Sequence, residues 1–132
     1  MNLTSEEKKA IISYRLEKSN KSMKEAQDNA KLNNWSLVAQ RLYYSAYYVA
    51  SALLLSKDLY PKSHNGVISL LNQQFVSTNI LDKSYAHIYS RLFEMRQTGD
   101  YDDCFDFTKE DVEPYFEKAS ALIKKLNSLI KD

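Results

Sequence analysis

Residues that interrupt helices are rare in this chain. Its 132 residues include only two glycines and two prolines, which is few for a domain of this length. Glycine and proline are the residues that most often mark turns and breaks. Their scarcity therefore favours long helices joined by short connections.

Apolar residues recur at spacings of three and four along five segments. This period places them on one face of a helix, so each segment is expected to be helical and to bury that face. The segment 35–57 has the broadest apolar face and is expected to be the most buried helix. The expected helices cover approximately residues 5–32, 35–57, 64–75, 83–98 and 109–130.

Polar side chains at the helix ends support these boundaries. Thr4 begins a capping-box pattern in which Glu7 stands three residues on. Gly99 is expected to end the fourth helix. Pro114 lies too far inside the last helix, so that helix is expected to begin near residue 112 or 113. Helix N-caps are expected at Thr4, at the pair Asn33-Asn34, and at Ser63, Asp82 and Thr108.

Four long helices and one short helix predict an all-α fold, an up-and-down four-helix bundle with one additional short helix. The length fits a single domain over residues 1–132, long enough to bury a helical core. Neither an internal repeat nor a low-complexity tract divides the chain.

The charge and cysteine content limit the possible functions. The chain has 18 basic and 17 acidic residues and a net charge of +1, so it offers no large basic field and any RNA contact must be local. The single cysteine, Cys104, excludes an internal disulfide and suits a reducing compartment. The polar start at residues 1–10 is unlike a signal peptide, and the apolar run 49–55 is too short to span a bilayer. A cytoplasmic protein without membrane contact is the expectation.

Three segments resemble the HEPN family, in particular its small stand-alone bacterial and archaeal proteins. They are Arg-Leu-Tyr-Tyr-Ser-Ala-Tyr-Tyr at 41–48, Lys-Ser-His-Asn-Gly-Val-Ile at 62–68, and Arg-Leu-Phe-Glu-Met-Arg-Gln-Thr-Gly-Asp-Tyr at 91–101. Their order and spacing are similar to that group over about residues 5–130. The resemblance implies a helical bundle that forms a homodimer and works beside a small nucleotidyltransferase in a toxin–antitoxin, defence or regulatory pair.

The family's ribonucleases use an arginine followed, after a gap of four to six residues, by a histidine. The arginine stabilises charge on phosphate, and the histidine exchanges protons with the reacting oxygens. Here Arg96 stands in the arginine position, but Tyr101, Asp102 and Asp103 occupy the permitted histidine positions. The resemblance therefore implies a non-catalytic or weakly catalytic partner protein.

Two other functions stay open. One is a divergent metal-independent endoribonuclease that uses Arg96, with Tyr101 and His64 as further catalytic candidates. It requires His64 to lie close to Arg96 in space. The other is a stand-alone nucleotide-binding regulatory module.

The candidate nucleotide- or RNA-binding residues are Arg41, Tyr44, Tyr48, Arg96 and Asp100. Arginine and tyrosine on one helix side suit phosphate contact and base stacking, but the same residue types are enriched in dimer interfaces. Arg96 has a second interpretation as a structural partner of Asp100 or Asp102. By analogy with related systems, Tyr101 is a candidate acceptor for nucleotide modification.

The two histidines have different expected roles. His64 lies at a helix start, where positive charge is disfavoured, so a neutral, hydrogen-bonded structural role is the first expectation and catalysis the alternative. His87 is expected to be solvated. The acidic run 100–106 lacks the glycine and the terminal glutamate of a calcium-binding loop, so no metal and no cofactor are expected.

Overall fold

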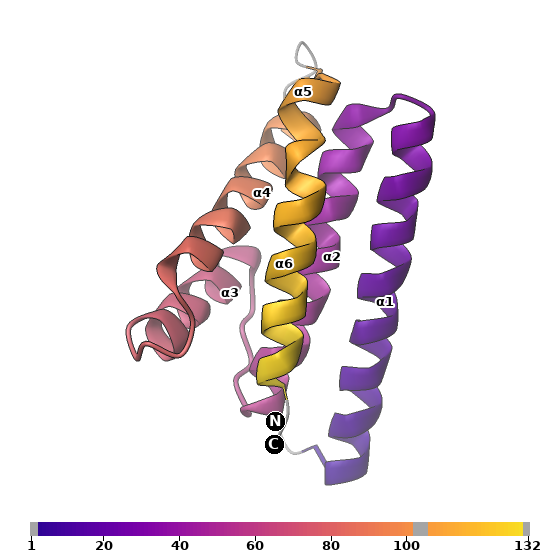
Figure 1. Ribbon diagram of the computed structural model, residues 1–132. Coiled ribbons are helices and arrows are strands. Elements are labelled where there is room, and N and C mark those ends of the chain that lie inside the picture. The colour runs from indigo at the N-terminus through magenta and orange to yellow at the C-terminus, as the bar shows by residue number, and fades with distance from the viewer. Residues whose placement is uncertain (1–2, 102–105, 131–132) are drawn as a thin grey trace.

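The computed structural model describes residues 3–101 and 106–130, except for the side chains of residues 100 and 101. Four long helices run up and down beside one another (Figure 1): α1 (Ser5–Lys31), α2 (Trp35–Ser56), α4 (Lys83–Tyr101) and α6 (Pro114–Leu129). Three short elements join them: α3 (His64–Leu71), the π-helical turn η1 (Asn72–Val76) and α5 (Lys109–Val112). The predicted all-α helical bundle is confirmed, and α5 is a further short helix that we did not expect.

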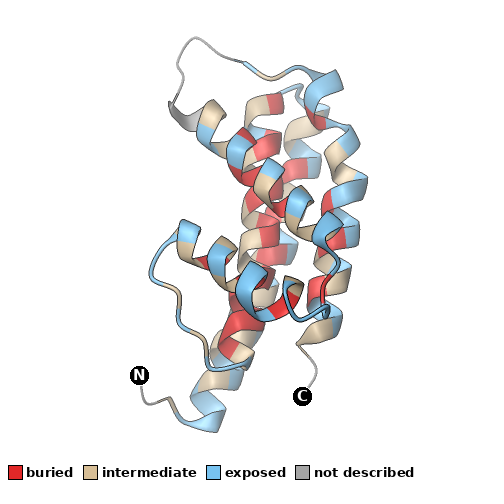
Figure 2. Ribbon diagram, turned by 90° about the vertical axis from the view of Figure 1, so that its left-hand side faces the viewer, coloured by how far each residue is buried: buried red, intermediate tan, exposed pale blue. Residues whose placement is uncertain are grey.

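The central element is α2, which packs against α1, α3, α4, α5 and α6. Leu42, Leu53 and Leu54 are fully buried on it, and burying such a side chain contributes about 1.5–3 kcal/mol. Buried residues line the inward faces of the helices in Figure 2. The expectation that this helix is the most buried is confirmed. Within the described part of the chain, no helix combines the length and the apolar run that a membrane span requires.

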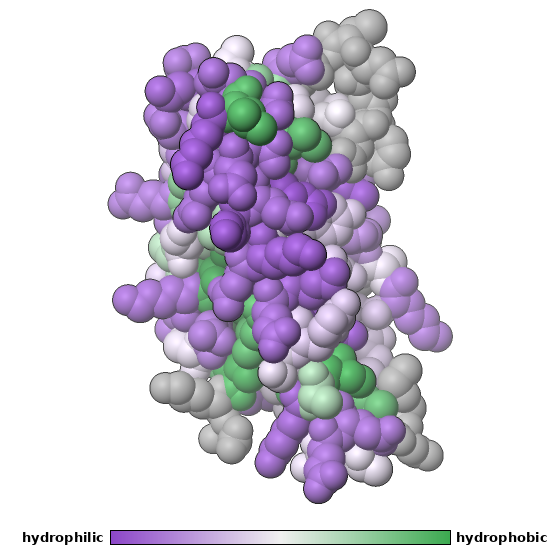
Figure 3. Space-filling view, turned by 90° about the vertical axis from the view of Figure 1, so that its right-hand side faces the viewer, coloured by the Kyte–Doolittle hydropathy of each residue, from purple (hydrophilic) through white to green (hydrophobic). Residues whose placement is uncertain are grey.

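Small residues let α1 approach α2 closely. Ser19 Oγ donates a hydrogen bond to the Ser45 carbonyl oxygen at 2.7 Å, and Ser45 Oγ donates to the Ser19 carbonyl at 3.0 Å. Both serines are buried, so these bonds satisfy hydroxyl groups that would otherwise be costly to remove from water. The opposite face of α1 is largely hydrophilic, as Figure 3 shows.

Most of the expected N-caps are present. Thr4 and Thr108 each form a reciprocal capping box, Ser63 Oγ accepts the Gly66 N–H, and an Asp82 carboxylate oxygen accepts the Ser84 N–H. The prediction for Asn34 is wrong in its chemistry. Asn34 occupies the N-cap position of α2 but makes no side-chain cap bond; its Nδ2 donates to the Asn29 side-chain oxygen at 3.3 Å.

The expectation that Gly99 ends the fourth helix is wrong. The helix continues to Tyr101, and no glycine of the described residues has a positive φ, so Gly99 serves as an ordinary helical residue. A Cβ there would lie 3.6 Å from the Phe107 ring, an ordinary contact. The last long helix begins at Pro114, one residue after the expected start near 112 or 113. At this first position the missing N–H of proline leaves no helical bond unmade.

Candidate functional site

A buried tyrosine on α2 holds the first residue of α3. Tyr43 is fully buried, and its hydroxyl oxygen lies 2.6 Å from Nδ1 of His64. His64 is half-buried at the start of α3. There the Ser63 hydroxyl caps the helix, and Pro61 lies so close that a Cβ added to Gly66 would meet it at 3.4 Å. The expected hydrogen bond of His64 is therefore present, and Tyr43 provides it.

Arg96 reaches the same tyrosines from α4. Its Nη2 donates a hydrogen bond to the Tyr44 hydroxyl at 3.0 Å. Its guanidinium carbon lies 5.5 Å from the centre of the Tyr44 ring and 6.0 Å from that of Tyr43, within the range of cation–π attraction. Two rings thus fix the position of the guanidinium group.

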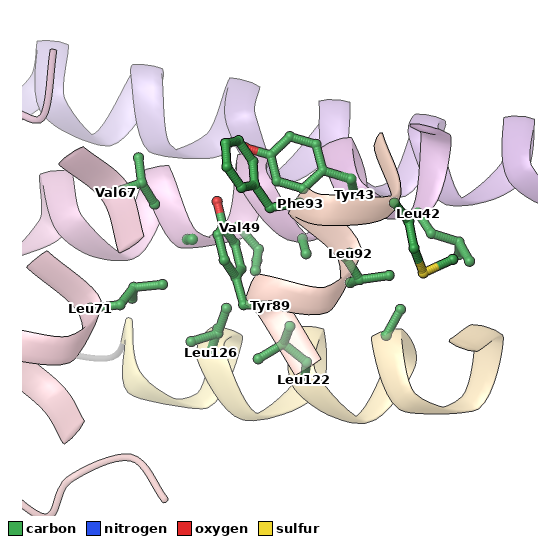
Figure 4. Close-up of a cluster of buried hydrophobic side chains, with 14 of the residues drawn as sticks. Leu42, Tyr43, Val49, Val67, Leu71, Tyr89, Leu92, Phe93, Leu122 and Leu126 are labelled. Carbon is green, nitrogen blue, oxygen red and sulfur yellow. The ribbon is translucent and has the colours of Figure 1, made fainter. Parts of the chain in front are cut away.

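His64 and Arg96 meet at these two rings. The centre of the His64 ring lies 5.7 Å from that of Tyr43 and 6.1 Å from that of Tyr44. The two rings that contact Arg96 thus also contact His64. The endoribonuclease hypothesis required His64 to lie close to Arg96, and both residues contact the rings of Tyr43 and Tyr44. Figure 4 shows Tyr43 beside Phe93, which closes the inner side of this cluster at 5.6 Å between ring centres.

The surroundings keep His64 neutral and Tyr43 protonated. Burial lowers the pKa of His64, and the positive charge of Arg96 lowers it further. Burial also raises the pKa of the Tyr43 hydroxyl well above its usual value near 10. The direction of the bond between them sets the chemistry of His64. When Tyr43 donates to Nδ1, Nε2 carries the ring proton and can donate to phosphate; when Nδ1 donates, Nε2 is free to accept a proton.

A second arginine, Arg41 on α2, also contacts this cluster. The Arg41 guanidinium carbon is 5.0 Å from the centre of the Tyr44 ring, and Arg41 Nη1 pairs with a Glu25 carboxylate oxygen at 3.2 Å. Tyr44 therefore contacts two guanidinium groups, and Glu25 partly neutralises one of them. Tyr48 lies one ring further along, 6.1 Å from Tyr44 between ring centres.

Some of the sequence-predicted residues fall elsewhere. The side chains of Asp100 and Tyr101, and all of Asp102, Asp103 and Cys104, lie outside the described residues, so the ion-pair and modification hypotheses stay predictions. His87 is exposed, as expected. Within the described ranges, no three histidine, cysteine, aspartate or glutamate side chains come together as a metal site would require.

Sequence reasoning missed two tyrosines of this cluster, Tyr43 and Tyr47. The Tyr43 ring is buried in the core, and its hydroxyl reaches His64. The Tyr47 ring lies 4.7 Å from that of His64. The signal was present in the repeated tyrosine pairs at 43–44 and 47–48, which helical spacing stacks one above the other.

The sequence pattern of the HEPN domain matches residues 12–129. A Thermotoga maritima protein named "UPF0332 protein" is 34% identical over 126 residues, covering 96% of each chain. A Methanocaldococcus jannaschii protein named "Putative toxin MJ0142" is 32% identical over 110 residues, covering 83% of this chain and 75% of that protein. An Archaeoglobus fulgidus "UPF0332 protein" is 23% identical over 121 residues, covering 86% of this chain and 96% of the relative.

Proposed function

Because this chain belongs to the HEPN domain family, we propose that it binds a phosphate group of a nucleotide or RNA at Arg96 and acts with a small nucleotidyltransferase. The setting would be a toxin–antitoxin, defence or regulatory module. The observation that carries the proposal is that Arg96 and His64 contact the same two rings, Tyr43 and Tyr44. Two relatives carry the word toxin in their names, which supports a module of that kind.

The site has the properties that phosphate recognition needs. An arginine fork held in place by aromatic rings loses little conformational freedom on binding, and it matches phosphate oxygens with paired N–H donors. A neutral His64 that carries its proton on Nε2 adds another donor. Tyr44 and Tyr48 add ring faces on which a base can stack. This arrangement supports binding without requiring catalysis.

The proposed protein is a homodimer in the cytoplasm. The half-buried tyrosines and arginines on the outer side of α2 suit an interface between two copies of the chain. A homodimer through α2 and α4 would set two Arg96 sites near a shared cleft, where a nucleotidyltransferase partner could reach them. The single cysteine suits the reducing cytoplasm.

A second candidate function is metal-independent cleavage of RNA, and one observation favours it. His64 and Arg96 both contact the Tyr44 ring, although the family's usual histidine positions after Arg96 hold other residues. In this mechanism Nε2 of His64 would take the proton of a 2′-hydroxyl as its oxygen attacks the adjacent phosphorus. Arg96 would stabilise the added negative charge on phosphate, and the 5′-oxygen would leave with a proton from solvent.

Binding is tested by titrating fluorescein-labelled single-stranded RNA, and separately ATP, into the wild type and Arg96→Ala. Loss of one charged contact should weaken binding by about 10- to 100-fold. Arg91→Ala is a matched control, because Arg91 is exposed on the same helix and pairs with Glu94. Equal affinity of wild type and Arg96→Ala for every ligand would rule out this site. Pull-down with nucleotidyltransferases tests the partner.

Catalysis is tested by incubating an RNA pool with purified protein in the presence of a chelator. Cleavage that disappears in both Arg96→Ala and His64→Gln would establish the ribonuclease. Binding without cleavage would favour the partner protein. The ¹⁵N shifts of the His64 ring then show which nitrogen carries the proton: Nε2–H fits the binding role, and Nδ1–H fits the base.

A further inference from the structure

A small cavity lies between α1, α2 and the loop that leads to α3. Its volume is about 250 Å³, and its lining includes Ile11, Arg15, Tyr47, Ser51, Tyr60 and Pro61. That volume is below the roughly 300–1,000 Å³ of pockets that enclose whole drug-sized ligands. The cavity therefore suits one planar part of a larger ligand.

Arg15 is the charged group of this cavity. Its Nη1 donates to the Ser51 carbonyl oxygen at 3.2 Å, and the side chain is half-buried. Within the described part of the chain, it pairs with no carboxylate, whereas Arg41 and Arg91 each do. One bond uses one of its five N–H donors. The remaining N–H donors of Arg15 are available to a planar acceptor that enters the cavity.

Aromatic and apolar side chains form the rest of the lining. Tyr47 and Tyr60 come from α2 and the following loop, and Leu55 and Pro61 add apolar surface. Tyr60 is 37% exposed, so its ring is accessible to a ligand. Rings beside an arginine fork are the combination that proteins use to recognise unpaired bases, by stacking on the ring and by hydrogen bonds to the base edge.

The cavity adjoins the Arg96 site through one residue. Tyr47 lines the cavity, and its ring lies 4.7 Å from that of His64 and 6.0 Å from that of Tyr44, between ring centres. Tyr44 in turn accepts the hydrogen bond from Arg96. A ligand with a phosphate at one end and a base at the other matches this order of groups.

We infer that the Arg15 cavity receives one nucleobase, with guanine preferred, of the nucleotide or RNA whose phosphate Arg96 holds. Guanine is preferred because its O6 and N7 acceptors match the paired donors of an arginine, the commonest specific contact to a base. The inference rests on the proposed phosphate site and adds its base specificity. A lysine at position 15 would keep the charge but lose the planar pair of donors.

The test uses labelled eight-nucleotide 2′-O-methyl oligomers, which resist cleavage through the 2′-oxygen. One is all uridine, one carries a single central guanine, and one has an abasic position there. For the wild type, the guanine oligomer should bind about tenfold more tightly than the uridine oligomer. Arg15→Lys and Tyr60→Ala should lose that preference while they bind the abasic oligomer as the wild type does. Arg91→Lys and Tyr14→Ala, at exposed sites outside the cavity, are the matched controls.

The outcomes separate this inference from the proposed phosphate site. A wild type without guanine preference, or a preference that survives Arg15→Lys, overturns the base cavity, while weaker binding by Arg96→Ala keeps the phosphate site. If Arg15→Lys weakens binding of the abasic oligomer as much as binding of the guanine oligomer, Arg15 contacts phosphate and the inference is overturned. Absence of any binding overturns both. Competition by guanosine monophosphate identifies a free nucleotide as the ligand, and competition by the oligomer alone identifies RNA; either supports the inference.

Discussion

Replacing Arg96 by methionine separates the charge of this residue from its apolar stem. Methionine fills similar space along α4 but removes the hydrogen bond to Tyr44 and both ring contacts. The hydrogen bond is worth about 0.5–1.5 kcal/mol, and each cation–π contact about 0.5–1 kcal/mol at a partly exposed site. The new side chain recovers some packing. We therefore expect a loss of about 2 kcal/mol in the free energy of unfolding.

Two measurements follow this variant. For a domain of this length, a loss of about 2 kcal/mol in the free energy of unfolding lowers Tm by about 8 °C. Calorimetry or circular dichroism detects such a change. The pKa of His64 should also rise part of the way toward its ordinary value of 6.5. The rise is partial because burial, the larger cause of the lowered pKa, stays in place. Proton NMR titration resolves it, since His87 is the only other histidine.

Arg91→Met is the control for both measurements. Arg91 is exposed, pairs with Glu94 three residues on and hydrogen-bonds to Tyr115 on α6. Exposed contacts of this kind are worth about 0.2–1 kcal/mol. Their loss should barely change Tm or the titration of His64. Equal losses of stability in the two variants, with an unchanged His64 pKa in Arg96→Met, would refute the claim that the rings hold Arg96 in a preorganised site.

Three further perturbations test the fold. The free energy of unfolding should fall as pH drops below 6.5, because the unfolded chain binds a proton at His64 more readily than the folded chain. Urea titrations at several pH values measure this fall, and the fall due to His64 should be absent in His64→Gln. Leu53→Ala should cost about 2–5 kcal/mol in urea unfolding because it leaves a cavity at a fully buried position, against less than about 0.5 kcal/mol for Leu32→Ala at an exposed one. Ser45→Val should cost at least about 2 kcal/mol because it removes a bond to Ser19 and overpacks the α1–α2 contact; a thermal melt like that of the wild type would contradict the close approach.

Local patterns predicted most of the fold. Helix periodicity identified the long helices because each must bury one stripe of apolar residues, and that requirement repeats within every turn. Caps at Thr4 and Thr108 were readable because a cap spans only four residues. Two predictions about helix ends were wrong, because the residue type at a helix end permits more than one conformation or bond. Asn34 makes no cap bond, although its amide nitrogen bonds to Asn29. Gly99 stays helical since nothing requires a positive φ there.

The candidate site was predictable only in part. The sequence identified Arg96, Arg41 and Tyr44 through helical spacing and the family resemblance, and the structure gathers these three at one ring. The sequence named His64 as a candidate but did not show which side chains it contacts. The bond from the Tyr43 hydroxyl to His64 was missed. The spacing of a tyrosine on an apolar helix face does not show whether its hydroxyl has a hydrogen-bond partner.

The sequence by itself determined the helical bundle and the HEPN family, because periodicity, caps and motif segments are properties of neighbouring residues. Only the tertiary structure decided which groups meet. The packing of α4 on α2 sets Arg96 over Tyr44, and the loop after α2 carries His64 back to Tyr43. The same loop and α1 form the Arg15 cavity. These contacts join residues far apart in the chain, and their geometry depends on packing that no local pattern encodes.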